Sequence, residues 1–136
     1  MGISFQAMIV EQQEKKTFTR RIGTRDTDEL PSRDLLVRVR YSALNFKDAL
    51  SATGNPGVTR NFPHTPGIDA VGEVIEDSSA TFQPGETVLL TGWDLGMNTA
   101  GGFGEYVRVP ANWALPLPQG LSMQDSMALG TAGLTA

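Results

Sequence analysis

Residues 41–50, YSALNFKDAL, carry the polar side chains best suited to chemistry, because they join an alternating strand to a short helix. Such a junction exposes unpaired backbone N–H groups to which a ligand can bind. Asn45 is a suitable N-cap, Asp48 stands three residues later as the partner of a capping box, and Gly54 supplies a helix stop. Two interpretations of Asn45 and Asp48 follow: they cap the helix, or they form the cofactor-facing corner of an active site.

His64 and Asp69 are the next candidates along the chain. His64 lies between Pro63 and Thr65 and is most simply a turn histidine, with catalysis as the alternative. Asp69 begins an apolar strand, where its carboxylate would either bond the backbone of the neighbouring loop or face a cleft. Ser/His/Asp catalysis is not supported, because no serine lies in a nucleophile-elbow sequence.

Two glycine clusters invite comparison with phosphate-binding loops. The first, at residues 101–104, departs from G-x-G-x-x-G and precedes a strand, whereas that motif opens a helix. The second, at residues 130–133, follows no strand. We therefore interpret both as tight turns or sites of close packing.

Composition excludes several classes of function. The chain has 136 residues, of which 40% are hydrophobic and 19% are charged. This length and composition are typical of one ordinary globular domain. The absence of cysteine removes disulfides, thiolate nucleophiles and cysteine-based zinc sites, and one histidine cannot build a histidine cluster, so we predict no metal. The net charge of −4 argues against nucleic acid as a partner.

The sequence also bears on membranes and targeting. No run of 18 apolar residues is present, and the amino terminus lacks the pattern of a signal peptide. We expect no membrane association and a cytoplasmic protein. Met1-Gly2 matches the opening of a myristoylation signal, but the residues after it continue into a strand, so we discount the match.

The pattern of elements favours a mainly β (α+β) fold. Fifteen glycines and eight prolines favour short strands joined by turns. We expect strands at about residues 4–10, 17–22, 36–41, 68–75, 86–90, 105–109 and 113–115, a helix at 45–53, and loops at 23–34, 55–66 and 92–104. In the strand at 36–41, Val37, Val39 and Tyr41 share one face. Gly72 marks a close backbone approach or a bulge. This arrangement predicts a partly open barrel.

The last segment differs in character. Residues 121–129 predict a helix with Ser122 as N-cap and Asp125 at its third position. The helix continues into GTAGLTA without a C-cap. We therefore expect the chain to be a piece of a longer protein.

Four segments together resemble a known family: YSALNFKDALSATG, NFPHTPGIDAVGEV, PGETVLLTGWDLGMNTAGGFGEYVRVP and MALGTAGLTA. The chain is similar to the zinc-free branch of the medium-chain dehydrogenase/reductase superfamily, and within it to the acryloyl-CoA reductase group, also described as YhdH-type quinone oxidoreductases. The resemblance implies that residues 1–120 form a GroES-like catalytic domain. Residues 121–136 would then be the connector helix to a Rossmann domain that lies outside this sequence and holds most of the NADPH.

The resemblance also implies the chemistry of the site. Zinc-dependent relatives carry a cysteine at the position of Asn45 and a histidine at that of Ile68, so neither zinc ligand is present here. Without that Lewis acid, hydride transfer from NADPH to an activated C=C bond suits the site better than reduction of a simple carbonyl. By position, Asn45, Phe46, Lys47 and Asp48 would border the nicotinamide and ribose, with Thr131 contributing from the connector.

The resemblance leaves the catalytic residues unknown. Some enoyl-thioester reductases of the superfamily have a proton-donating tyrosine in the loop after the helix, but residues 55–60 contain none, so the proton would come from solvent. Arg60 is either a contact for a CoA phosphate or an exposed loop arginine.

The implied activity is reduction of acryloyl-CoA to propanoyl-CoA by a homodimer acting on a small-molecule substrate. The alternatives are a quinone or enal oxidoreductase of the same superfamily, and an isolated domain fragment without catalytic activity.

Overall fold

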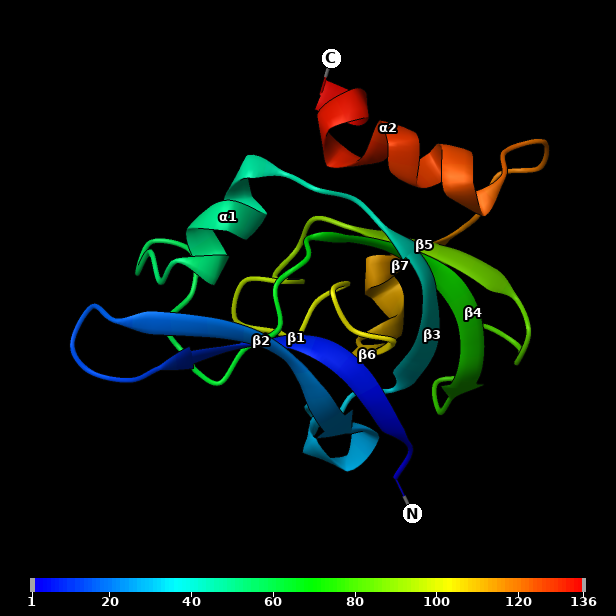
Figure 1. Cartoon of the computed structure of the whole chain (residues 1–136). Helices are drawn as coiled ribbons and strands as arrows, with labels where there is room; N and C mark the ends of the chain where they lie inside the picture. The colour runs from blue at the N-terminus through cyan, green and yellow to red at the C-terminus, as the bar shows by residue number, and fades with distance from the viewer. Residues whose placement is uncertain (1, 136) are drawn as a thin grey trace.

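The computed structural model describes residues 2–135 and consists mainly of short strands with two α-helices (Figure 1). Met1, part of the discounted myristoylation match, and Ala136 lie outside the described residues. The elements run in the order β1 (Ser4–Gln12), β2 (Phe18–Asp26), η1 (Thr27–Glu29), β3 (Leu35–Ser42), α1 (Phe46–Ala52), β4 (Asp69–Asp77), β5 (Thr87–Thr91), β6 (Tyr106–Val109), η2 (Ala111–Trp113), β7 (Ala114–Pro116) and α2 (Met123–Thr135).

The strands of the described chain form two sheets with antiparallel pairing throughout. A ribbon of β1 and β2 stands beside a five-stranded sheet with the order β6-β3-β4-β5-β7. Isolated bridges from Ala7 to Gly104 and from Val10 to His64 tie the ribbon to the loops that precede β4 and β6. This arrangement confirms the predicted mainly β fold with a helix inserted after the third strand.

The core lies on the inner face of the five-stranded sheet. Its residues alternate along the strands and are fully or nearly fully buried: Leu35, Val37, Val74, Val88, Leu90, Val107 and Val109. Gly72 in β4 is where two backbones approach, because a Cβ built there would meet the carbonyl oxygen of Arg38 at 2.0 Å. The expected close approach at Gly72 is therefore confirmed.

Two expectations about the strands were wrong. Tyr41 was expected on the buried face of β3 but is 44% exposed. The pairing of β3 with β4 shifts register between Val39 and Tyr41, and an extra residue in one strand reverses the face of every residue after it.

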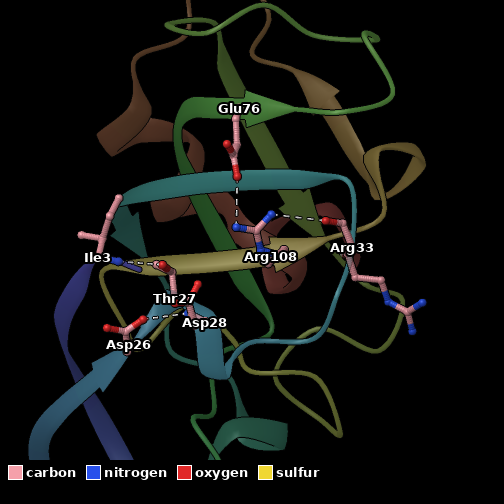
Figure 2. Close-up of polar contacts among 7 residues, drawn as sticks. All are labelled: Ile3, Asp26, Thr27, Asp28, Arg33, Glu76 and Arg108. Carbon is pink, nitrogen blue, oxygen red and sulfur yellow. Dashed lines mark hydrogen bonds and ion pairs between the residues drawn. The ribbon is translucent and has the colours of Figure 1, made fainter. Parts of the chain in front are cut away.

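Residues 23–34 were expected to be a loop, but β2 continues to Asp26 because β1 pairs with it along its whole length. The 3₁₀ turn η1 follows at once. The backbone N–H of Asp28 donates to Oδ1 of Asp26 at 2.8 Å, and the backbone N–H of Ile3 donates to Oγ1 of Thr27 at 2.8 Å (Figure 2). The first bond caps η1, and the second fastens the residue before β1 to the turn that follows β2.

One arginine adds side-chain bonds to the backbone pairing of the edge strand β6 with β3. Nη2 of Arg108 donates to Oε1 of Glu76 at 3.1 Å, and Nη1 donates to the carbonyl oxygen of Arg33 at 3.3 Å (Figure 2). The first bond reaches β4, and the second reaches the segment before β3.

The carboxyl-terminal helix α2 packs across β4 and β3 at the top of the view in Figure 1. The backbone N–H of Asp125 donates to Oγ of Ser122 at 3.0 Å, which confirms Ser122 as the N-cap. The helix is kinked at Gly130, whose φ of 52° and ψ of −161° are not helical. This kink brings the start of its last turn to β4 and to the start of α1.

Candidate functional site

The start of α1 has the local geometry that the sequence predicted. Asn45 is the N-cap, with an extended backbone, and its N–H donates to Oδ2 of Asp48 at 2.8 Å. The carboxylate of Asp48 therefore closes the reciprocal half of a capping box. Its other oxygen, Oδ1, accepts the backbone N–H of Ile68 at 2.9 Å. Asp48 thus joins the start of α1 to the residue that precedes β4.

Asp48 is only 2% exposed. Burial raises the pKa of its carboxyl group; hydrogen bonds from Ile68 and Asn45 act in the opposite direction, and the charge of Asp69 adds to the rise. Both oxygens of the side chain accept backbone N–H groups, so Asp48 holds the start of α1 in a fixed position against the residue that precedes β4.

Asp69, the first residue of β4, is the centre of the site and is fully buried. Its Oδ2 accepts Nδ2–H of Asn45 at 2.8 Å and the backbone N–H of Thr131 at 2.8 Å. Its Oδ1 accepts the hydroxyl of Thr131. One carboxylate therefore connects three segments that are far apart in sequence. Of the two alternatives for Asp69, the bond to the backbone of the neighbouring loop is not the one that forms, since the bonded groups belong to the start of α1 and to α2.

Gly130 permits this contact with α2. A Cβ at Gly130 would lie 2.9 Å from Oδ2 of Asp69 and 3.3 Å from Cβ of Ala43, and its φ of +52° disfavours any side chain. The glycine therefore lets the helix bend so that the N–H of Thr131 meets the carboxylate. The second glycine cluster serves close packing, as interpreted from the sequence.

The structure brings three of the five predicted cofactor contacts together: Asn45 and Thr131 bond to Asp69, and Asp48 bonds to Asn45. The other two, Phe46 and Lys47, lie in the first turn of α1 with exposed side chains; Phe46 is 79% exposed. An apolar ring and a cation thus stand beside the buried polar network. Asp69 was not among the predicted contacts, although a carboxylate opening the apolar run of β4 was a signal for it.

Arg60 lies elsewhere, in the loop after α1. Its Nε donates to the carbonyl oxygen of Pro56 at 3.0 Å, and its backbone N–H donates to Oδ1 of Asn98 at 2.9 Å. These bonds hold the arginine to its own loop and to residue 98. Arg60 is exposed and borders a separate pocket, described below.

His64 has a structural position. It is 3% exposed, its backbone pairs with Val10, and its Nε2 lies 2.8 Å from the carbonyl oxygen of Gly96, to which it donates. Burial lowers the pKa of the imidazole, while the bond to Gly96 acts in the opposite direction. His64 thus lies in a buried β-bridge rather than in a turn, so the expectation of a turn histidine was wrong, and its ring bonds to the loop at Gly96.

Residues 2–135 contain no group of three or more His, Cys, Asp or Glu side chains arranged to hold a metal ion. None of the helices in that range is long and apolar enough to cross a membrane.

Comparison with known proteins places this geometry in a family. The model of the "Alcohol dehydrogenase GroES-like domain" matches residues 31–119. Probable acrylyl-CoA reductase AcuI of Escherichia coli is 46% identical over 131 residues, which are 96% of this chain and 40% of that protein. Putative quinone oxidoreductase YhfP of Bacillus subtilis is 38% identical over 136 residues, which are 100% of this chain and 41% of that protein.

Solved structures agree with the sequence matches. E. coli YhdH with bound NADPH superposes with a TM-score of 0.91 at 44% identity, over 96% of this chain and 40% of that one. Bacillus subtilis YhfP with bound NAD gives a TM-score of 0.92 at 37% identity, over 98% of this chain and 40% of that one. The chain thus spans about 40% of the length of these relatives. The resemblance drawn from the four sequence segments is confirmed.

Proposed function

The chain belongs to the alcohol dehydrogenase GroES-like domain family, and we propose that it forms the substrate side of an NADPH-dependent reductase of activated C=C bonds, with acryloyl-CoA as the acceptor. Two relatives that bear the name acrylyl-CoA reductase are 46% and 39% identical to it. The observation that carries the proposal is the network around Asp69, which holds Asn45 and Thr131 in fixed positions next to an exposed Phe46.

In this proposal the corner borders the nicotinamide and its ribose. The exposed ring of Phe46 offers an apolar face to a flat heterocycle, and Lys47 beside it offers a cation to the ribose-phosphate side. Asp48 is 2% exposed and each of its oxygens accepts a backbone N–H group, so its role in this proposal is to keep Asn45 in place. Thr131 approaches from α2.

NADPH, when bound, supplies a hydride to the β-carbon of the enoyl thioester. This chain contributes the shape of the corner and the second amide hydrogen of Asn45, which favour the enolate that develops on the thioester oxygen. The α-carbon takes its proton from solvent. Most contacts to NADPH come from outside residues 1–136, because the sequence contains no G-x-G-x-x-G loop. In this proposal residues 1–120 form the catalytic domain, and residues 121–136 connect it to the part of the protein that binds most of the NADPH.

The proposed reaction does not use zinc. The positions of the two zinc ligands in zinc-dependent relatives hold Asn45 and Ile68. One of the two amide hydrogens of Asn45 is donated to Asp69, which leaves the second for a substrate, and an isoleucine side chain has no ligand atom. These two residues support polarisation of the substrate by the amide of Asn45 rather than by a metal.

The test is a steady-state assay of the full protein that carries this sequence, following NADPH consumption with acryloyl-CoA, a quinone and an enal. We expect the highest kcat/KM with acryloyl-CoA. The 38% identity to a quinone oxidoreductase makes quinone reduction the second candidate, and a higher kcat/KM for the quinone would select it. If none of the three acceptors is reduced, the proposal fails.

The third candidate is a domain without activity of its own. Calorimetric titration of residues 1–136 with NADPH addresses it, and we expect no tight binding because the phosphate contacts lie outside this sequence.

A further inference from the structure

A second pocket, of about 380 Å³, lies at the opposite end of α1 from Asn45. Its walls come from the β1–β2 hairpin, through Lys16 and Phe18, and from the loop after α1, through Arg60 and Phe62. Its volume falls in the lower part of the range for small-molecule sites, which is about 300–1,000 Å³. Figure 1 shows the hairpin and this loop together at the left of the molecule.

The charge of this pocket is positive. Lys16 and Arg60 are both exposed, and none of the described residues that line the pocket is acidic. The Nε of Arg60 is anchored to the carbonyl oxygen of Pro56 at 3.0 Å, so its two terminal nitrogens remain for a ligand. Nearby, Nη1 of Arg20 donates to the carbonyl oxygen of Ala52 at 2.9 Å and so offsets the negative end of α1. Two cations at one rim suit a phosphate group.

The pocket also has an aromatic wall. The rings of Phe18 and Phe62 are 5.0 Å apart at an interplanar angle of 52°, and both are partly exposed. Gly54 allows this wall to form, because a Cβ there would lie 2.1 Å from the ring of Phe18. Phenyl rings beside cations suit a nucleotide, because its base stacks on the rings and its phosphates bind the cations.

We propose that this pocket binds the 3′-phosphoadenosine end of a CoA thioester. The proposal rests on the function proposed above and extends it by naming the part of the substrate that is recognised far from the reacting bond. The seven residues of α1 separate the pocket from Asn45, about 10 Å along the helix axis, which the pantetheine arm of CoA can bridge. The same chemistry, a phosphorylated adenosine, also occurs in NADPH, so the test must separate the two sources.

The first experiment compares acryloyl-CoA with acryloyl-pantetheine in the full protein that carries this sequence. We expect Lys16→Gln and Arg60→Gln each to raise KM for acryloyl-CoA about tenfold, with kcat nearly unchanged, because each removes one charge-assisted phosphate contact. Acryloyl-pantetheine, which lacks the phosphoadenosine, should show no change. Lys15→Gln and Arg33→Gln are matched controls, since both residues are exposed and outside the pocket.

The second experiment does not depend on the reaction. Adenosine 3′,5′-bisphosphate and adenosine 2′,5′-bisphosphate are titrated into residues 1–136 by calorimetry. We expect the 3′,5′ isomer to bind and Lys16→Gln and Arg60→Gln to weaken it about tenfold. Absence of binding, equal binding of the 2′,5′ isomer, or equal effects of the variants on both thioesters would overturn the inference. Binding of the 3′,5′ isomer without turnover of acryloyl-CoA would support the pocket and reject the proposed function.

Discussion

The amide of Asn45 and the carboxylate of Asp69 are joined by a hydrogen bond of 2.8 Å across 24 residues of sequence. Asp69 accepts two further hydrogen bonds from Thr131, 62 residues later. A buried carboxylate with all its donors in place is stable, whereas removal of one donor leaves part of a charge without a partner. The site can therefore be tested by changing single members of this network.

Asn45→Ala should lower the free energy of unfolding by about 1–2 kcal/mol, because Oδ2 of Asp69 loses one of its two donors. Asn45→Asp should lower it further, since a third carboxylate would then stand beside Asp48 and Asp69. Urea denaturation at neutral pH measures both changes. Asn112→Ala, at an exposed position in η2, is the control and should stay within about 0.5 kcal/mol of the unmodified chain. Equal effects at positions 45 and 112 would contradict the role of Asn45.

Asp48→Asn should cost about 2 kcal/mol, although it is nearly isosteric. Both oxygens of Asp48 accept backbone N–H groups, from Asn45 and Ile68, and an asparagine keeps only one acceptor and turns its NH₂ group toward the other donor. Chemical denaturation again gives the magnitude. Asp69→Asn is the comparison, because the hydroxyl of Thr131 can accept from an NH₂ group; we expect a smaller loss there. The opposite order would show that Asp48 is not constrained as described.

Gly130→Ala should destabilise the chain by about 3 kcal/mol or more, because the new Cβ would meet Oδ2 of Asp69 at 2.9 Å in a residue with φ of +52°. Gly120→Ala is a matched control: its φ is +82°, but a Cβ there has nothing within 4 Å, so only the backbone strain of about 1–2 kcal/mol applies. Thermal and urea unfolding of both variants separate the contact from the strain. If the two losses are the same, Gly130 is not required for the approach of α2 to Asp69.

The stability of the chain should fall between neutral and mildly acidic pH in a way that depends on His64. Burial lowers the pKa of the folded-state imidazole below 6.5, so below that pH the unfolded chain binds a proton that the folded chain does not. The contribution of the imidazole to the free energy of unfolding is therefore fully present above a pH of about 6.5. It declines as the pH falls toward the folded-state pKa, by at most about 1.4 kcal/mol per pH unit.

The measurement is urea denaturation at a series of pH values for the unmodified chain and for His64→Gln, whose amide can still donate to Gly96. The difference between the two curves isolates the histidine from the carboxylates. A difference that does not change with pH in this window would show that the imidazole titrates as it does in the unfolded chain.

The amino-acid sequence was enough to predict the features that depend on residues close together in the chain. The capping partners Asn45 and Asp48, the N-cap Ser122 and the alternation that buries Val37 rest on hydrogen bonds three residues apart or on a period of two. The close backbone approach at Gly72 could be predicted because glycine is the only type of residue that lacks a Cβ. With the four family segments, these were enough to predict the barrel and to propose a site at the start of α1.

Contacts between segments that are distant in sequence could not be predicted and became visible only in the folded chain. The exposure of Tyr41 follows from a shift in the pairing of β3 with β4, which no local pattern records. The partners of Asp69 and the pairing of Phe18 with Phe62 are contacts across 24 to 62 residues. Such contacts depend on strand register and on the bend at Gly130, because a side chain finds its buried partner only after the backbones that carry both have been placed.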